Sequence, residues 1–293
     1  MTRRGLLLFA AMCVIWGMPY LLILVAVREL SPAVLVLART TLAAALLLPL
    51  AAWRGELRHL SGHWPPLLAF AAIEIAIPWV LLGAAEQHVS SSLTALVIAG
   101  VPLVATVLAL TTGTRERPAP VNVVGLGIGV AGVAAIVGLS VDGAPLPFLA
   151  LAVVAVCYAV GPAILQRWLS GLPAMGVIAA SLSVTAVAYV PIAAFSLPSE
   201  MPSAKALGSV VGLAVVCTAI AFVCFFALIA EVGPVRATVI TYVNPAVAAV
   251  LGVVILDEHL TPAMLAGFAL VLVGSALATR APAPELEPAA ERV

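Results

Sequence analysis

Apolar residues are gathered along the chain in long runs, and polar residues are confined to the short segments between them. The runs are rich in Leu, Val, Ala and Ile, and the segments between them carry charge, proline or glycine. A helix needs ~20 apolar residues to cross a hydrocarbon layer of ~30 Å, so each run predicts one transmembrane helix. The predicted helices are 5–27, 32–53, 65–86, 91–111, 120–140, 146–167, 174–197, 205–230, 236–256 and 261–279.

Composition favours an all-α integral membrane protein, with the lipid bilayer as its surroundings. Hydrophobic residues make up 64% of the 293 residues and charged residues 9%, whereas a soluble domain carries roughly 25% charged residues. The net charge is zero and no basic patch occurs, so nucleic acid is not expected as a partner. The four cysteines lie within apolar runs and are expected to be buried small side chains, with no metal site.

The positions of Lys and Arg predict the orientation, because basic residues near helix ends stay on the cytoplasmic side. With a cytoplasmic N-terminus, ten basic residues fall inside, Arg28 and Lys205 fall outside, and Arg39 lies within a helix. We therefore expect a multi-pass protein of the cytoplasmic (inner) membrane with both termini in the cytoplasm. The first apolar run is expected to be a permanent helix. Residues 280–293, rich in Pro, Ala and Glu, are expected to form a disordered cytoplasmic tail.

The chain contains an internal repeat. Placing Pro102 over Pro245 aligns residues 93–110 with residues 236–253. Two copies of five helices are the simplest explanation, with residues 1–141 as the first and 142–279 as the second. A five-helix unit that starts inside ends outside, so its copy is inverted, which is a signature of transporters. The predicted fold is ten transmembrane helices in two inverted five-helix repeats around a central cavity.

Glycine and proline residues interrupt corresponding helices of the two repeats. Paired breaks of this kind predict a binding site near the membrane midplane, because backbone groups freed by a break must be satisfied by protein or by a wet cavity. Kinking and close helix packing are the alternative explanation for each of them. The residues are Gly17, Pro19, Pro102, Gly161, Pro162 and Pro245.

These patterns resemble the drug/metabolite transporter superfamily of the EamA-domain type, whose members have ten helices in two EamA repeats. The resemblance covers residues 5–279. It implies gradient-driven export or uptake of small metabolites, often amino acids, and the lack of a phosphate-binding loop motif agrees with that. In the second repeat, Ala180 stands near the position of Arg39 and the first helix lacks a Trp. The residues that carry the resemblance are Trp16–Gly17, Pro32 with Arg39, Pro102, Glu116, Gly125 and Gly132, and again Pro245, Glu258, Gly267 and Gly274.

Arg39 and Glu74 are the strongest candidates for binding chemistry, because ionisable side chains at membrane depth are costly and usually face the bundle interior. We expect Glu74 to exchange a proton or to engage a substrate amine. Arg39 would offer its planar fork to a carboxylate. The structural alternative is a permanent Arg39–Glu74 ion pair that holds two helices together.

A set of aromatic and polar residues near the predicted breaks completes the expected substrate site. Aromatic rings with polar tips suit an amphipathic solute. Hydrogen bonding between helices, worth ~0.6 kcal/mol for each bond on average, is the alternative explanation for each residue taken singly. These residues are Trp16, Tyr20, Trp79, Tyr158, Ser181, Thr185, Tyr242 and Asn244.

Glu86, His88 and Glu231 lie near helix ends, where we expect them to be solvated. A gating or proton-relay role is the alternative, since histidine titrates near neutral pH. Arg115, Glu116, Asp257, Glu258 and His259 are likewise expected to be loop charges.

The function expected from these observations is secondary transport of a small amphipathic metabolite. An amino acid or related compound is favoured, and so are export and alternating access. Coupling to protons is left open. A nucleotide-sugar carrier is the main rival, but Arg39 is the only cation at membrane depth and phosphates need several. A drug-type carrier is also open. A membrane enzyme is disfavoured because no metal or nucleophile motif occurs, and a pore because no continuous polar lining is evident. We expect no cofactor, and a monomer or weak homodimer.

Overall fold

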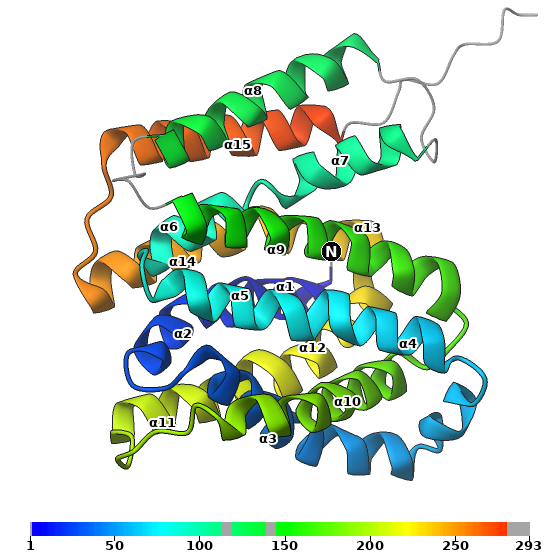
Figure 1. Cartoon of the computed structure of the whole chain (residues 1–293). Helices are drawn as coiled ribbons and strands as arrows, with labels where there is room; N and C mark the ends of the chain where they lie inside the picture. Colours follow the sequence, from blue (N-terminus) through cyan, green and yellow to red (C-terminus); the bar gives the residue numbers. More distant parts are fainter. Residues whose placement is uncertain (1, 113–118, 139–144, 280–293) are drawn as a thin grey trace, which may run out of the picture.

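The protein is helical throughout the part of the chain that the computed structural model describes, residues 2–112, 119–138 and 145–279 (Figure 1). The all-α class predicted from the sequence is confirmed for these residues. Three predicted features lie outside them: the tail 280–293, the junction between the repeats at 139–144, and the loop with Arg115 and Glu116.

Among the described residues, eight segments are long and apolar enough to cross a membrane, and two further apolar helices have 17 residues each. Their ends agree with the predicted ranges to within a few residues. The short helices η1 (Glu56–Leu60) and α13 (Pro234–Ala237) lie between them. The eight segments are α1 (Arg3–Ile15) with α2 (Pro19–Val27); α3 (Pro32–Trp53); α4 (Trp64–Phe70), η2 (Ala71–Ala76) and α5 (Ile77–Glu86); α6 (Ser91–Ile98) with α7 (Val101–Thr111); α8 (Pro120–Gly138); α9 (Pro145–Ile164) with η3 (Leu165–Leu169); α10 (Ala174–Ala194); and α11 (Ala204–Val211), η4 (Gly212–Ile220) and α12 (Ala221–Val232). The two shorter helices are α14 (Ile240–Leu256) and α15 (Pro262–Ala278).

Local sequence explains where several of these helices begin. Ser31 accepts a hydrogen bond from Val34 N at 3.2 Å, and Thr261 accepts one from Met264 N at the same distance. In both cases the next residue is proline, which fits the first helical position because its missing N–H would have no partner there.

Two of the predicted helix breaks are present and two are wrong. The chain leaves the helix between α1 and α2, at Trp16–Met18, and between α6 and α7, just before Pro102. Pro162 and Pro245, in contrast, lie inside the continuous helices α9 and α14. Proline within a helix removes one hydrogen bond, and neighbouring helices can compensate for that loss in a bilayer without the helix ending.

Three spans contain a π-helical stretch that the hydropathy pattern does not reveal. These are η2, η3 and η4. In η4 the side-chain Oγ1 of Thr218 also donates to Leu213 O, five residues earlier, at 2.8 Å. Such bulges are rare in proteins, and those that occur are often found at functional sites. The π-helix η2 contains Glu74.

The helices α8 and α15 pack with their backbones in contact through glycines. A Cβ on Gly132 would lie 2.6 Å from Gly267 O, and one on Gly267 would lie 2.8 Å from Gly132 O. A Cβ on Gly274 would lie 2.7 Å from Gly125 O. Only glycine allows this approach, which is typical of helix pairs in membranes. Residue numbers rise along α8 while those of the contacting residues on α15 fall, so the two helices are antiparallel.

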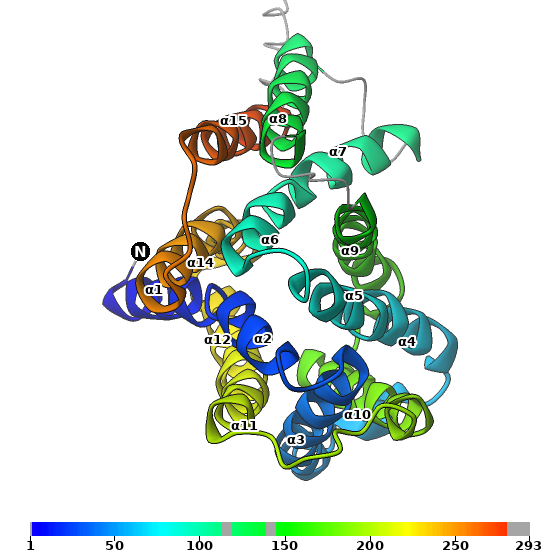
Figure 2. The same ribbon diagram turned by 60° about the vertical axis from the view of Figure 1, so that its left-hand side comes forward.

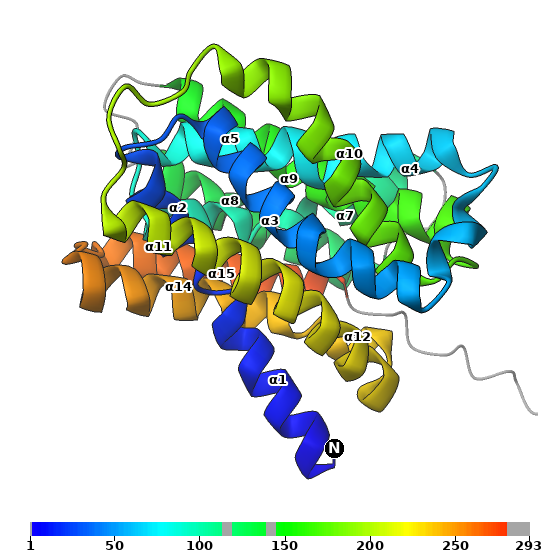
Figure 3. The ribbon, with the colours of Figure 1, turned by 90° about the horizontal axis from the view of Figure 1, so that it is seen from below.

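The remaining helices form a bundle beside this pair. Seen nearly end-on in Figure 2, α2, α3, α5, α9, α6 and α12 surround the middle of the bundle, and α8 and α15 lie to one side. The helix α3 packs against α10 and η4, and α5 packs against α9. The helix α1 packs against α12 and α14, as Figure 3 shows from below. The helices that carry Tyr20, Arg39, Glu74 and Tyr158 are therefore neighbours.

Candidate functional site

The buried side chain of Arg39, on α3, is held by two neighbours from different helices. Its Nε donates to Thr218 Oγ1 at 3.0 Å, and its guanidinium carbon lies 3.6 Å from the centroid of the Trp79 ring. A cation over a tryptophan face at this distance is worth ~2 kcal/mol or more when it is desolvated. Within the described residues, nothing accepts a hydrogen bond from the terminal nitrogens of Arg39, so the planar fork is available to a ligand.

Thr218 is a site residue that sequence reasoning missed. It is fully buried in η4, accepts from Arg39 and donates to the backbone of its own helix. The available signal was a lone hydroxyl residue inside a long apolar run. That signal is weak, because threonine satisfies itself on helix backbone in many membrane spans.

Tyr158, on α9, connects Arg39 to the other predicted site residues. Its side chain lies near those of Trp79, Tyr20, Glu74 and Arg39. Five residues proposed from the sequence are therefore brought together from α2, α3, η2, α5 and α9. Aromatic faces, one cation and one carboxyl group share this part of the bundle.

Glu74 faces this cluster from the π-helix η2. Its Oε2 atom is buried and has no hydrogen-bond partner among the residues that the structure describes. The carboxylate lies against Gly161, in space that a side chain at that position would fill. No ion pair joins Glu74 to Arg39 in the described structure, so the alternative of a permanent ion pair is not supported. A buried carboxyl oxygen without a partner is costly, and it marks a candidate site for a ligand or a proton.

Ser181 and Thr185 present two more buried hydroxyl groups without partners in the described part of the chain. They lie one turn apart on α10, which packs against α3 and η2. The same helix is fixed to η2 by Tyr189, whose hydroxyl donates to Ala76 O at 2.8 Å. Both residues therefore remain candidates for hydrogen bonds to a solute.

Three predicted site residues make contacts between helices instead. Trp16 packs on Phe225, with ring centroids 4.7 Å apart. Tyr242 lies 3.3 Å from the hydroxyl of Thr279, at the end of α15. The amide of Asn244, with its nitrogen facing the acceptors, donates to Cys13 O at 3.2 Å and so joins α14 to α1. For these residues the structure favours the packing explanation.

The predicted helix-end residues differ in their surroundings. His88 is exposed, as expected. Glu231 accepts a hydrogen bond from the Thr2 hydroxyl and is partly exposed. Glu86 was expected to be solvated, and this is wrong: it is 1% exposed, and neither carboxylate oxygen has a hydrogen-bond partner within the described ranges. The helix α2 packs against α5 and covers this end of it.

Glu258 was expected to be a loop charge and instead caps a helix far away in sequence. Its Oε1 accepts from Ser91 N at 2.8 Å and from Ser91 Oγ at 2.9 Å. Its Oε2 accepts from Ser92 N at 2.9 Å and also from Ser92 Oγ. A carboxylate at the N-terminus of a helix is favoured by free N–H groups and by the helix dipole. Glu258 therefore fixes the link between α14 and α15 onto α6.

Two other carboxylates hold helix starts in the same way. Glu29 accepts from Ser203 N and Ser203 Oγ, both at 2.6 Å, at the start of α11. These hydrogen bonds lower the pKa of the exposed Glu29 carboxyl below its usual value. Glu56 accepts from Gly176 N at 2.8 Å in the first turn of α10. Contacts of this kind tie the loops to the ends of the bundle.

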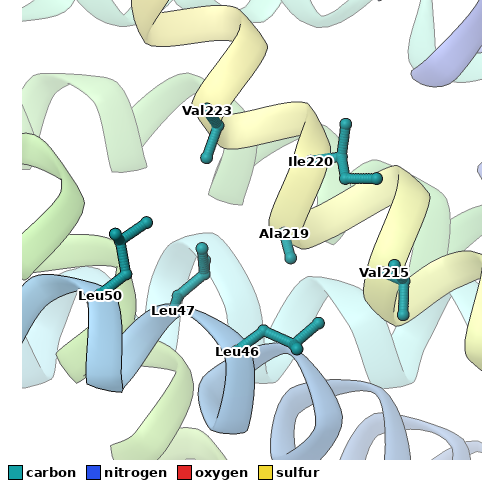
Figure 4. Close-up of a pocket in the computed structure, with 7 residues that line it drawn as sticks. All are labelled: Leu46, Leu47, Leu50, Val215, Ala219, Ile220 and Val223. Carbon is teal, nitrogen blue, oxygen red and sulfur yellow. The ribbon is translucent and has the colours of Figure 1, made fainter.

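A cavity of about 370 Å³ lies between α3 and the segment formed by η4 and α12 (Figure 4). All of its lining residues are apolar, so it is distinct from the polar cluster around Arg39. The lining residues are Leu46, Leu47, Leu50, Val215, Ala219, Ile220 and Val223.

No cluster of three or more possible metal ligands occurs within residues 2–112, 119–138 and 145–279. The polar cluster offers a guanidinium, a carboxyl group, aromatic rings and hydroxyls.

Comparisons with known proteins agree with this fold. Residues 3–138 and 146–280 each match the EamA-like transporter family. The chain is 30% identical over 251 residues to a protein of Escherichia coli (strain K12) described as the uncharacterized inner membrane transporter YedA, which covers 83% of this chain and 79% of that protein. The YedA protein of Escherichia coli O157:H7 matches equally well. A solved crystal structure is similar in fold, with a TM-score of 0.68, 23% identity, and coverage of 94% of this chain and 96% of that one.

Proposed function

The chain belongs to the EamA-like transporter family and is a membrane transporter, and we propose that it carries a small amphipathic metabolite by alternating access. An amino acid or related compound is the favoured substrate, and export the favoured direction. The observation that carries this proposal is the cluster of Arg39, Trp79, Tyr158, Glu74 and Tyr20 within the bundle.

The cluster suits a solute with a carboxylate, an amine and an apolar body. The terminal nitrogens of Arg39 would bind the carboxylate through two parallel hydrogen bonds. Glu74 has an oxygen without a partner, which would accept from an ammonium group. Trp79 and Tyr158 would contact the apolar body. One cation at this depth fits one carboxylate better than the diphosphate of a nucleotide sugar.

The reciprocal glycine contacts of α8 and α15 support the proposal of two inverted repeats. Gly125 corresponds to Gly267 in the repeat, and Gly132 corresponds to Gly274. The contact between Gly132 and Gly267 therefore has a counterpart between Gly274 and Gly125. Both contacts are present in the structure. A two-fold axis between the helices produces such a pattern. Two similar halves give inward-open and outward-open states of nearly equal energy.

The orientation proposed from the basic residues places both termini in the cytoplasm and the protein in the inner membrane. In this orientation α5 ends and α6 begins at the outer side. Glu258 lies at the same side, because it caps α6.

Transport in sealed vesicles tests the proposed function. Purified protein would first be screened by thermal shift against a panel of amino acids and related metabolites. Compounds that raise the melting temperature would then be assayed in proteoliposomes. Saturable uptake that is accelerated by unlabelled solute on the opposite side indicates a carrier. Linear, unsaturable flux would contradict the proposal in favour of a pore, and chemical conversion of the solute would contradict it in favour of an enzyme.

A further inference from the structure

Glu86 is a buried acid that the substrate cluster does not use. It is the last residue of α5, the helix drawn in cyan in Figure 1. Neither oxygen has a hydrogen-bond partner among the described residues, although the backbone of Leu24 approaches it. Its side chain is buried, with 1% of its surface exposed. An ionised carboxylate buried without donors is strongly disfavoured, so Glu86 is held in its neutral, proton-bearing form.

Glu258 lies close enough to Glu86 for charges on the two carboxyl groups to interact. Glu258 accepts four hydrogen bonds from Ser91 and Ser92, and contacts of this kind stabilise a negative charge. Neither oxygen of Glu86 has a hydrogen-bond partner among the described residues, so the two acids differ in the donors available to a negative charge. Ionisation of Glu86 would therefore place a second negative charge beside the cap.

The cap joins the two halves of the chain. The donors Ser91 and Ser92 begin α6 in the first half, and Glu258 follows α14 in the second. The helices approach closely here, since a Cβ on Gly252 of α14 would collide with Ser92 Oγ and with Glu258 Oε2. We call the contact of Glu258 with Ser91 and Ser92 the outer clasp.

We propose that Glu86 is a proton-binding site whose protonation keeps the outer clasp closed. With the proton bound, Glu86 is neutral and Glu258 remains on α6. When the hydrogen bonds of the outer clasp break and water reaches this side, the Glu86 carboxyl releases its proton to water. The resulting carboxylate then repels Glu258, and the clasp closes again only after a proton returns. The use of this device in coupling rests on the proposed transport function, but the proton site itself does not.

The other titratable groups near Glu86 do not explain such a switch. Tyr20 faces it from α2, and Tyr158 of α9 lies beyond Tyr20. Both are phenols, which stay neutral in the physiological range. His88 is two residues away but exposed, so it is the natural control for pH effects at this end.

Hydrogen exchange of residues 91–98 in the purified full-length protein tests the proposal without any solute. After correction for intrinsic exchange rates, we expect protection of the wild type to fall as the pH rises from about 6 to about 9, by up to ~10-fold per pH unit. Glu86→Gln imitates the neutral acid and should keep protection high at every pH. Glu258→Gln should lose protection at every pH. The controls His88→Ala and Glu200→Gln, both at exposed positions, should behave as the wild type.

Three results would overturn the proposal. The first is a Glu86→Gln variant whose protection depends on pH as strongly as that of the wild type. The second is a His88→Ala variant whose protection no longer depends on pH. The third is protection from hydrogen exchange that changes with the sodium concentration when sodium replaces choline at constant pH, which would indicate a metal-ion site. Solute flux in proteoliposomes is measured separately. Lack of flux together with pH-linked protection would reject transport and leave the proton site standing.

Discussion

The carboxylate of Glu74 occupies the space beside Gly161 that a Cβ at that position would need. The glycine belongs to α9 and the acid to η2, so the two helices meet where one has no side chain. Gly161 was expected to break a helix, but it lies within the continuous helix α9, where it makes room for the candidate binding group.

Gly161→Ala should therefore displace the Glu74 side chain. Overpacking of a tight contact costs ~1–3 kcal/mol, so we expect a lower melting temperature together with weaker transport. Gly208→Ala is the matched control, because a Cβ there meets nothing within 4 Å. A Gly161→Ala protein with wild-type stability and wild-type solute affinity would show that the contact is not important.

Arg39→Lys keeps the charge but loses the planar fork, the hydrogen bond from Nε to Thr218 and much of the stacking on Trp79. We expect the apparent solute affinity to fall ~10-fold or more, where each tenfold corresponds to about 1.4 kcal/mol. Thermal-shift titration with the identified solute measures it. Arg167→Lys is the control, since Arg167 lies over Trp168 at 5.3 Å on the exposed surface. Equal affinities of wild type and Arg39→Lys would remove Arg39 from the binding site.

Glu74→Gln tests whether the carboxyl group of η2 takes part in proton exchange. The amide cannot release a proton in this range, so the variant should transport at a rate that no longer depends on pH, or should not transport at all. Uptake by proteoliposomes at several pH values measures this. Full activity with the pH profile of the wild type would exclude a proton role for Glu74 and leave it as a packing residue.

Substitution of Gly132 and of Gly274 should have similar effects if the two halves are related by a two-fold axis. In each case a Cβ meets backbone of the opposite helix. We expect alanine at either position to reduce the free energy of unfolding by ~1–3 kcal/mol, measured by denaturation in detergent. Gly127→Ala, on the open side of α8, should change it by much less. A large effect at one position and none at the other would speak against the symmetry.

The contact of Glu29 with Ser203 predicts a pH-dependent contribution to stability. Hydrogen bonds lower the pKa of Glu29 in the folded protein below its usual value of 4.5. The stability that this contact contributes is therefore present above pH 4.5 and is lost as the pH falls through the folded pKa. The melting temperature of the wild type should exceed that of Glu29→Gln at neutral pH, and the difference should disappear in acid. A difference that persists unchanged in strong acid would exclude this origin.

Hydropathy was sufficient to locate the helices but not their internal geometry. The range 32–53 coincides with α3, because apolar length and a Ser–Pro start are local properties. The cost of burying charge drew attention to Arg39 and Glu74, and the structure buries Arg39 and the Oε2 atom of Glu74 inside the bundle. Pro245 was misjudged, because whether a proline ends a helix depends on neighbours that only the folded protein supplies.

The acids at the bundle ends were predicted poorly for a related reason. Glu258 finds its donors 166 and 167 residues away, at Ser92 and Ser91. Glu86 is covered by a helix from another part of the chain. Neither partner is visible in local sequence, where an acid beside a helix end looks solvated.

The π-helix η2 also decides which way Trp79 points. Trp64 and Leu68 are exposed and lie on one face of the span, the face turned toward lipid. In an uninterrupted α-helix, with ~100° per residue, Ile75 and Trp79 would lie on the same face. Instead Ile75 is 1% exposed, Trp79 is 9% exposed, and Ile77 is on the outside at 38%. The one wide turn rotates everything after it, so a tryptophan that would otherwise have faced hydrocarbon stacks on Arg39.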